Sequence, residues 1–317
     1  MNYPVFDLHC DTALNLVEHN NHKKQSLRSN QGHIDLERGK KLSGYCQCFA
    51  CFTTPLMEKW YQIGAEEVFQ AELRALRSAL TENKDILRQA FSPADIEQNR
   101  KDGYISAVFT LEGTAGIGYD PARLEELYKM GFRIASLGWN EQNPLCGSNV
   151  TGGGLTDLGR TFVREAQRLG ILIDVSHISD EAFWDIMDIT QAPVIATHSN
   201  SRAICGESRN LTDDMFRQIC QTGGVAGFNQ YAEFVGHPAT IECACSHFLH
   251  FMEIDPEGKH IALGGDLDGC EELTIGFDGI QSYPLFAENL LRYGLSEQNI
   301  QDIYWNNALG VMERCCI

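Results

Sequence analysis

Short apolar runs alternate along the chain with longer segments of helical spacing. The runs are rich in β-branched and aromatic residues and lie at residues 5–11, 45–52, 105–113, 132–139, 171–177, 192–199, 224–231 and 260–266. Between them, apolar residues recur at intervals of three or four over residues 65–91, 121–130, 156–169, 180–189, 212–221, 240–251 and 285–293. This alternation predicts a parallel sheet covered by helices, in the α/β class. Eight such strands predict a single (β/α)8 barrel of the TIM type.

An open doubly wound sheet is the alternative fold. It would usually carry a glycine-rich nucleotide turn after its first strand, where this chain reads HCDTALN. No internal repeat or proline-rich linker divides the sequence, so we expect one catalytic domain over residues 1–317. We expect a last helical segment, residues 297–314, to pack outside the barrel. Gly152, Gly153 and Gly154 are expected to form a flexible loop beside the active rim.

The side-chain charges narrow the range of partners. The 43 acidic and 25 basic residues leave a formal net charge of −18, which disfavours binding to nucleic acid or to anionic lipid. No apolar run approaches the roughly 20 residues of a membrane-spanning helix, and the first residues lack the pattern of a secretory signal. We therefore expect a cytoplasmic protein with reduced cysteines, in which Cys46, Cys48 and Cys51 pack as small apolar side chains.

Five of the predicted strands end in residues that can bind or transfer charge. These residues are His9 and Asp11 in the first strand, Glu112 in the third, His177 in the fifth, His198 in the sixth and Asp266 in the eighth. Because chemistry in such barrels lies at the carboxyl ends of the strands, we expect these side chains to meet at one rim. A lone histidine there is usually a hydrogen-bonded structural residue. Three imidazoles with two or three carboxylates, however, would leave uncompensated buried charge unless cations lay among them.

Divalent metal ions are the simplest compensation for such a cluster. Imidazole and carboxylate without thiolate suit zinc, with manganese, iron or cobalt as substitutes. One ion takes three or four protein ligands, whereas the cluster offers five: His9, Asp11, Glu112, His177 and His198. We therefore expect two Zn²⁺ ions per chain that share Glu112, since no lysine ends a predicted strand to provide a carbamylated bridge. Two such ions also hold a bridging hydroxide at neutral pH, which predicts a hydrolase.

Asp266 is the expected acid/base of that hydrolase. It would orient the hydroxide, accept its proton and pass the proton to the leaving group, which requires a site that raises the proton affinity of the carboxylate. Asp268 shares the strand phase of Asp266 and is the alternative. Asp266 is favoured because it ends the apolar run and so lies nearer the rim.

At these residues the sequence resembles the membrane dipeptidase family, also called renal dipeptidase, a family of binuclear zinc metallopeptidases on a (β/α)8 barrel. The resemblance runs from the first strand to about residue 310. It is carried by DLHCDT at Asp7, TLEG at Thr110, IDVSHIS at Ile173, THSNSRAIC at Thr197, SRNLTDD at Ser208 and GGDLDG at Gly264. Each motif is short, but six in order at compatible spacing are specific.

The resemblance implies a role for each candidate residue. His9, Asp11 and Glu112 would hold one zinc ion, Glu112, His177 and His198 would hold the other, and Asp266 would be the acid/base. Arg209 matches the family arginine that binds the terminal carboxylate of a dipeptide, a role that suits a guanidinium fork. The resemblance also implies dipeptide substrates, a tolerance of D-residues at the carboxyl side, and a homodimer.

One position differs from the family pattern. Trp139, in the stretch Leu137-Gly138-Trp139-Asn140, stands where many members carry a histidine that stabilises the tetrahedral intermediate. An indole N–H donates one hydrogen bond but carries no charge, so stabilisation of the oxyanion would be weaker or would pass to Asn140. Tyr231, which ends the seventh strand, is expected to line the substrate pocket.

Two other functions remain open on the sequence. The first is a binuclear metal hydrolase for a lactone, a cyclic amide or a phosphoester. The second is a catalytically inactive barrel that binds a peptide, which Trp139 alone encourages.

Overall fold

The computed structural model describes residues 3–18 and 24–315. Eight parallel strands form the wall of a barrel, in the spatial order β10, β11, β1, β2, β4, β5, β8, β9. A bridge between Ala196 and Ala226 joins the two ends of this order, so the barrel is nearly closed. The strands are β1 (Val5–Asp7), β2 (Tyr45–Phe52), β4 (Ile105–Glu112), β5 (Phe132–Ser136), β8 (Leu172–Asp174), β9 (Val194–Ile195), β10 (Ala226–Phe228) and β11 (Ile261–Leu263). Each lies within one of the eight predicted runs, so the predicted barrel is confirmed.

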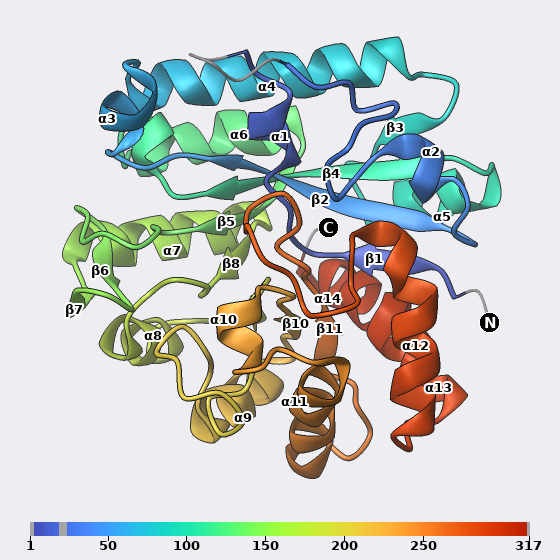
Figure 1. The fold of residues 1–317 in the computed structure, drawn as a ribbon. Helices are drawn as coiled ribbons and strands as arrows, with labels where there is room; N and C mark the ends of the chain where they lie inside the picture. The colour runs from blue at the N-terminus through green and yellow to red at the C-terminus, as the bar shows by residue number, and fades with distance from the viewer. Residues whose placement is uncertain (1–2, 19–23, 316–317) are drawn as a thin grey trace.

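Helices surround the strands on the outside (Figure 1). The longer ones are α4 (Ala65–Glu82), α5 (Pro93–Lys101), α7 (Asp157–Leu169), α8 (Asp180–Met187), α9 (Asp213–Thr222), α11 (Ile241–Ile254), α12 (Tyr283–Arg292) and α14 (Asn307–Cys315). Shorter helical segments are α1 (Thr12–Asn15), α2 (Leu36–Gly39), α3 (Met57–Tyr61), α6 (Leu124–Met130), α10 (Ala232–Val235) and α13 (Glu297–Gln301), with a π-helical turn at Asp302–Asn306. 3-10 turns lie at Ala115–Ile117, Pro121–Arg123 and Ile280–Ser282.

Capping residues explain where several helices begin and end. Thr156 starts α7 and accepts a hydrogen bond from the amide of Gly159, and Thr212 and Ser179 do the same for α9 and α8. Gly170 ends α7 with a left-handed φ of 81°, a conformation that a residue without Cβ adopts at little cost. Local chemistry therefore sets these boundaries close to the predicted ones.

The predicted helix over residues 65–91 is wrong in its last third. Helix α4 ends at Glu82, and Leu87–Gln89 forms a short strand, β3, parallel to the start of β4. Strand β5 pairs with β4 only from Phe109 onward, so the amino-terminal edge of β4 is left for β3 to cover. The strand was missed because its pairing partner, not its own sequence period, determines its conformation.

The predicted flexible loop at Gly152, Gly153 and Gly154 is also wrong. These residues belong to β7 (Gly152–Leu155), which forms an antiparallel hairpin with β6 (Cys146–Ser148). A Cβ atom at Gly147 would lie 1.9 Å from the carbonyl oxygen of Gly152, so close approach of the two backbones requires glycine at position 147. Gly152 and Gly153 instead have left-handed φ values of 67° and 96°, and a Cβ atom at Gly154 would lie 2.4 Å from Oδ2 of Asp185.

Apolar side chains form an interior core and a separate outer core. The interior of the barrel is filled by side chains from every strand of its wall or beside it: Phe6, Leu8, Cys46, Cys48, Val108, Ile134, Leu172, Ile195, Val225 and Ala262. Trp305, Val311 and Met312 pack against this interior set, and Asn307 donates hydrogen bonds to the carbonyls of Gly258 and Ile261 at the start of β11. The carboxyl-terminal segment therefore closes the amino-terminal end of the barrel, instead of packing only on its outside as predicted.

The cysteines of β2 pack as small apolar side chains, as the sequence predicts. Cys46 and Cys48 are buried in the interior core and Cys51 in the outer core, and no disulfide joins cysteines within residues 3–18 and 24–315. Among the same residues, no helix combines the length and the apolar character that crossing a membrane requires.

Candidate metal centre

His9 reaches the carboxyl end of the barrel because the chain changes phase after Leu8. Phe6 and Leu8 point into the interior core, whereas Cys10 packs in the outer core. Strict alternation would therefore point His9 outward. Instead β1 ends at Asp7, whose carboxylate accepts hydrogen bonds from the amides of His9 and Gly265 and from the hydroxyl of Tyr283. This anchored break lets His9 and Asp11 both enter the mouth of the barrel, on one face as predicted.

Two further site residues depend on an unusual backbone. His177 has a φ of 72° and Asp266 a φ of 56°, both in the left-handed region that side chains with a Cβ rarely adopt. Each follows a short strand, β8 and β11 respectively, and the left-handed turn directs its side chain over the mouth of the barrel. Such strain persists only where the surrounding structure enforces it, and it concentrates at functional sites.

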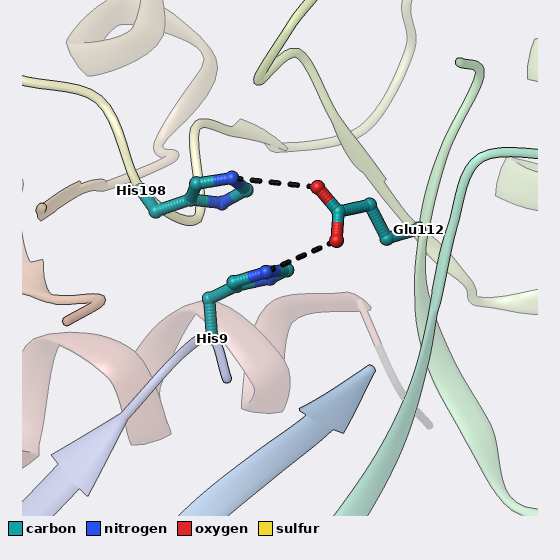
Figure 2. Close-up of side chains that lie close together, drawn as sticks. All are labelled: His9, Glu112 and His198. Atoms are coloured by element: carbon teal, nitrogen blue, oxygen red, sulfur yellow. Dashed lines mark ion pairs between the residues drawn. The ribbon is translucent and has the colours of Figure 1, made fainter. Parts of the chain in front are cut away.

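Glu112 lies at the centre of the cluster (Figure 2). Its Oε2 is 3.2 Å from Nε2 of His9, and its Oε1 is 3.0 Å from Nε2 of His177 and 3.6 Å from Nε2 of His198. Nε2 of His9 also lies 3.4 Å from Oδ2 of Asp11 and 3.9 Å from Oδ1 of Asp266. The six residues predicted to meet are therefore brought together, and the carboxylate of Glu112 lies within 3.6 Å of Nε2 of all three histidines.

The partners of the histidines favour a bound cation. Thr197 Oγ1 lies 2.6 Å from Asp174 Oδ2 and 2.6 Å from Nδ1 of His198, and its single proton is used by the carboxylate, so Nδ1 of His198 is the donor. Nδ1 of His177 likewise faces Oδ1 of Asn140 at 2.9 Å. Both Nε2 atoms then carry lone pairs, yet they lie only 3.0 Å apart and beside Glu112. Two Nε2 lone pairs that face each other without a proton between them are typical of metal ligands. In such sites the other ring nitrogen donates to an outer partner, as Nδ1 does here in both histidines.

Two buried atoms without hydrogen-bond partners also favour a bound cation. Among the described residues, Nε2 of His9 and Oδ1 of Asp11 are buried without a hydrogen-bond partner. Groups of His9, Glu112 and His198, and of His9, Asp11 and Asp266, each present ligand atoms within 4.8 Å of one another. Imidazole nitrogens and carboxylate oxygens without thiolate suit zinc or a similar divalent ion. The residues therefore fit a metal centre.

Burial and mutual charge shift the titration of the cluster. Burial, with the nearby charge of Arg209, holds the pKa values of His177 and His198 well below the ordinary range, so both are neutral, as ligands must be. His9 differs: against the opposing effect of burial, the carboxylates of Glu112 and Asp11 raise its pKa well above the ordinary value, so a cation that binds here would have to displace a proton from His9. Burial and the Asp11 carboxylate raise the pKa of Glu112 to about 8. Burial likewise raises the pKa of Asp266 against the opposing effect of His9, in the direction that an acid/base needs.

Asp266 and Asp268 occupy different surroundings. Oδ2 of Asp266 accepts a hydrogen bond of 2.9 Å from Nδ2 of Asn229, and its other oxygen faces His9. Asp268 turns away from this group: its carboxylate accepts hydrogen bonds from the hydroxyl of Thr12 and the amide of His33, both at 2.7 Å. Asp266 is therefore the aspartate beside the ligands, and Asp268 ties the loop after β11 to neighbouring segments.

Arg209 is buried beside the cluster with most of its donors unused. Nη1 donates to the hydroxyl of Ser199 at 2.6 Å, whereas Nε and Nη2 have no hydrogen-bond partner among the described residues. The guanidinium carbon lies 5.7 Å from the ring centroid of Phe234. Two adjacent free donors on one edge of a guanidinium match the two oxygens of a carboxylate.

A cavity of about 730 Å³ opens above the ligands. Asp11, Glu112, His177 and Asp266 line its floor, and its walls include Trp139, Asn140 and Tyr231, three of the four residues predicted for substrate binding. Arg209 instead lines a smaller adjoining pocket, which shares His177 with the cavity. Asn140 has a second contact that the sequence did not reveal, since its Oδ1 faces His177. The indole of Trp139 packs against Phe52 and His177, with ring centroids 5.3 Å and 6.1 Å away.

Thr197, Asp174 and Asn229 were missed as functional residues. They hold His198 and Asp266 in place and touch the cluster only through these residues. A threonine beside a candidate histidine was the one available signal, in the stretch THS at residues 197–199. The contacts from Asp174 and Asn229 cross between strands and leave no local pattern.

Comparisons with known proteins identify the family of this chain. The family model for membrane dipeptidase, peptidase family M19, matches residues 1–315. An uncharacterized dipeptidase of Schizosaccharomyces pombe is 29% identical over 98% of this chain and 80% of its own length. A crystal structure of a metallopeptidase from Rhodobacter sphaeroides, liganded with a phosphinate mimic of the dipeptide L-Ala-D-Ala, superposes with a TM-score of 0.88 at 25% identity, over 99% of this chain and 100% of that one. A probable dipeptidase from Pseudomonas aeruginosa shares the fold, with a TM-score of 0.88 at 17% identity, over 99% of this chain and 96% of that one. The chain therefore belongs to the membrane dipeptidase family of metallopeptidases, whose members are dipeptide-hydrolysing enzymes on a TIM-type barrel.

Proposed function

We propose that this metallopeptidase is a zinc dipeptidase with two ions per chain. His9, Asp11 and Glu112 would hold one ion, and Glu112, His177 and His198 the other, with Glu112 and a hydroxide as bridges. The observation that carries the proposal is the 3.0 Å approach of two imidazole nitrogens whose outer nitrogens already have partners. Two divalent ions, when bound, would lower the pKa of water toward 7 and polarise the scissile carbonyl.

Asp266 is proposed to move the proton of the reaction. Hydrolysis adds hydroxide to the carbonyl carbon and a proton to the departing amine. Asp266 lies beside the ligands, and burial raises its pKa, so its carboxylate can take the proton from water and return it to nitrogen. Asn229, hydrogen-bonded to Oδ2, would keep the reactive oxygen facing the cluster.

Arg209 is proposed to recognise the terminal carboxylate of the substrate. Its buried Nε and Nη2 offer a two-pronged contact, and a buried cation left without an anion is costly. A carboxylate bound there limits the chain beyond the scissile bond to one residue, which favours dipeptides. The L-Ala-D-Ala mimic in the Rhodobacter sphaeroides metallopeptidase supports extending the proposal to D-residues at the second position.

A dipeptide panel with and without chelation tests the proposed function. We expect hydrolysis of L-Ala-L-Ala and L-Ala-D-Ala by the protein loaded with zinc, loss of activity after chelation, and recovery when about two equivalents of zinc are restored. Hydrolysis that persists after chelation would contradict the metal centre. Turnover of a lactone, a cyclic amide or a phosphoester but of no dipeptide would favour the alternative hydrolase, and metal binding without any turnover would favour the inactive barrel.

Three expectations from the sequence stay predictions. They are a cytoplasmic location, a homodimer, and one catalytic domain over residues 1–317, whose first two and last two residues lie outside the described part of the chain.

A further inference from the structure

An aromatic wall lies across the mouth of the barrel from Arg209. Phe52 ends β2, Trp60 lies in α3 after the same strand, and Trp139 follows β5. The ring of Trp139 packs edge-on against both of the others, with centroids 5.3 Å from Phe52 and 5.7 Å from Trp60. Arg209 instead follows β9. In the barrel order β1, β2, β4, β5, β8, β9, β10, β11, the strand β2 before Phe52 and Trp60 lies four places from β9, directly across the rim, and the strand β5 before Trp139 lies two places from it.

The wall presents apolar surface to the cavity. Phe52, Trp60 and Trp139 all line it, together with Leu14 and Tyr61. Phe52 and Trp139 are buried on the side away from the cavity by a small apolar cluster that includes Met57 and Val68, whereas Trp60 is 38% exposed at the rim. An aromatic box backed by a packed cluster is rigid enough to select a side chain by shape.

The candidate metal ligands lie between Arg209 and the aromatic wall, and this order indicates which residue of a dipeptide faces the wall. A dipeptide in extended form spans about 7 Å. With its carboxylate at Arg209 and its peptide bond above Glu112, its amino-terminal residue points toward Phe52, Trp60 and Trp139. In this orientation the carboxyl-terminal residue lies on the arginine side of the ligands.

We propose that Trp60, Trp139 and Phe52 form the subsite for the amino-terminal side chain, and that the preferred substrates are dipeptides with a large apolar or aromatic first residue. The inference rests on the proposed dipeptidase function. An acidic first residue is disfavoured, since the acidic residues Asp11 and Glu271 line the same cavity. In this chain Trp139 therefore acts on substrate selection.

Kinetics on dipeptides that share a carboxyl-terminal glycine test the subsite. We expect kcat/KM of the zinc-loaded protein to be tenfold or more higher for Phe-Gly and Leu-Gly than for Gly-Gly, because a filled apolar pocket discriminates on this scale. Asp-Gly is expected to be the poorest substrate of the series. Equal kcat/KM for Phe-Gly, Gly-Gly and Asp-Gly would overturn the inference while leaving the dipeptidase function intact. Failure to cleave any member would instead count against the proposed function.

Variants of the wall separate selection from general damage. Trp60→Ala removes a partly exposed rim side chain, so it should fold even if Trp139→Ala does not. We expect Trp60→Ala to lower the ratio of kcat/KM for Phe-Gly to that for Gly-Gly at least fivefold. Trp184→Ala is the matched control, because Trp184 is 41% exposed on α8 and does not line the cavity. An unchanged ratio in Trp60→Ala, or an equal fall in the Trp184→Ala control, would overturn the proposal.

Discussion

At the scale of single residues, the chemistry of this site depends on what holds each reactive group. Strand-end position predicted His177 and His198 as ligands, but their usable nitrogens are determined by Asn140 and Thr197. Asn140 follows β5, whereas its partner His177 follows β8. Asp174 of β8 accepts the hydroxyl proton of Thr197, which lies 23 residues later in the chain. Residue identity was therefore predictable from the sequence, whereas tautomer and orientation were not.

Arg209→Met tests recognition of the terminal carboxylate. We expect KM for a free dipeptide to rise roughly 10²-fold, because a buried charge-assisted contact is lost. The same dipeptide with an amidated carboxyl terminus should be affected far less, since it offers no anion. Measured kcat and KM for the two substrates decide the matter, with Arg217→Met, an exposed arginine on α9, as control. Equal changes for free and amidated substrates would argue for a structural role.

At the scale of elements, the interior core joins strands to the carboxyl-terminal segment. Trp305 is 2% exposed, and its ring lies 5.7 Å from that of Phe6 in β1. Its indole nitrogen also donates a hydrogen bond of 2.9 Å to Glu97 of α5. The helical period predicted that residues 297–314 form a helix. Their place at the amino-terminal end of the barrel, however, depends on contacts with a strand nearly 300 residues earlier. β3 and the β6–β7 hairpin were missed for the same reason.

Trp305→Ala should destabilise the whole barrel. We expect the free energy of unfolding to fall by about 3–5 kcal/mol, the usual cost of truncating a buried tryptophan. Urea unfolding followed by circular dichroism measures the change. Trp184→Ala should alter the unfolding free energy by less than about 0.5 kcal/mol, because that side chain is partly exposed. A loss in Trp305→Ala no larger than in this control would show that the π-helical turn Asp302–Asn306 is not part of the core.

At the scale of the whole molecule, buried acidic groups link stability to pH. Glu72 on α4 is fully buried, its Oε1 accepts a hydrogen bond of 3.3 Å from the amide of Phe52, and its Oε2 has no partner among the described residues. Burial, and then the negative charge of Asp11, raises the pKa of Glu72 well above its usual value. Its contribution to stability is therefore complete below the unfolded-state pKa near 4.5 and is lost as pH rises through the folded-state pKa.

Glu72→Gln should remove this dependence. The variant is expected to be more stable than the wild type by roughly 1–3 kcal/mol at pH 8, because unfolding of the wild type then lets a carboxyl that disfavours ionisation when buried ionise in water, and to show little advantage at pH 5. Urea unfolding at both pH values, with a chelator present throughout, measures the difference. Glu67→Gln, an exposed change on the same helix, should show no such pH-dependent gain. A gain that is equal at both pH values would exclude titration of Glu72 as the cause.

The sequence by itself determined the eight strands, the fold class and the residues that gather at the rim. It could do so because apolar period and strand-end position are local properties, and because the carboxyl ends of parallel strands must meet. Only the tertiary structure decided how His9 enters the mouth after a change of phase, which nitrogens are left to bind a cation, and that Trp139 packs with Phe52 and Trp60 in one aromatic wall. These features depend on contacts between strands and loops far apart in the chain, which no local pattern records.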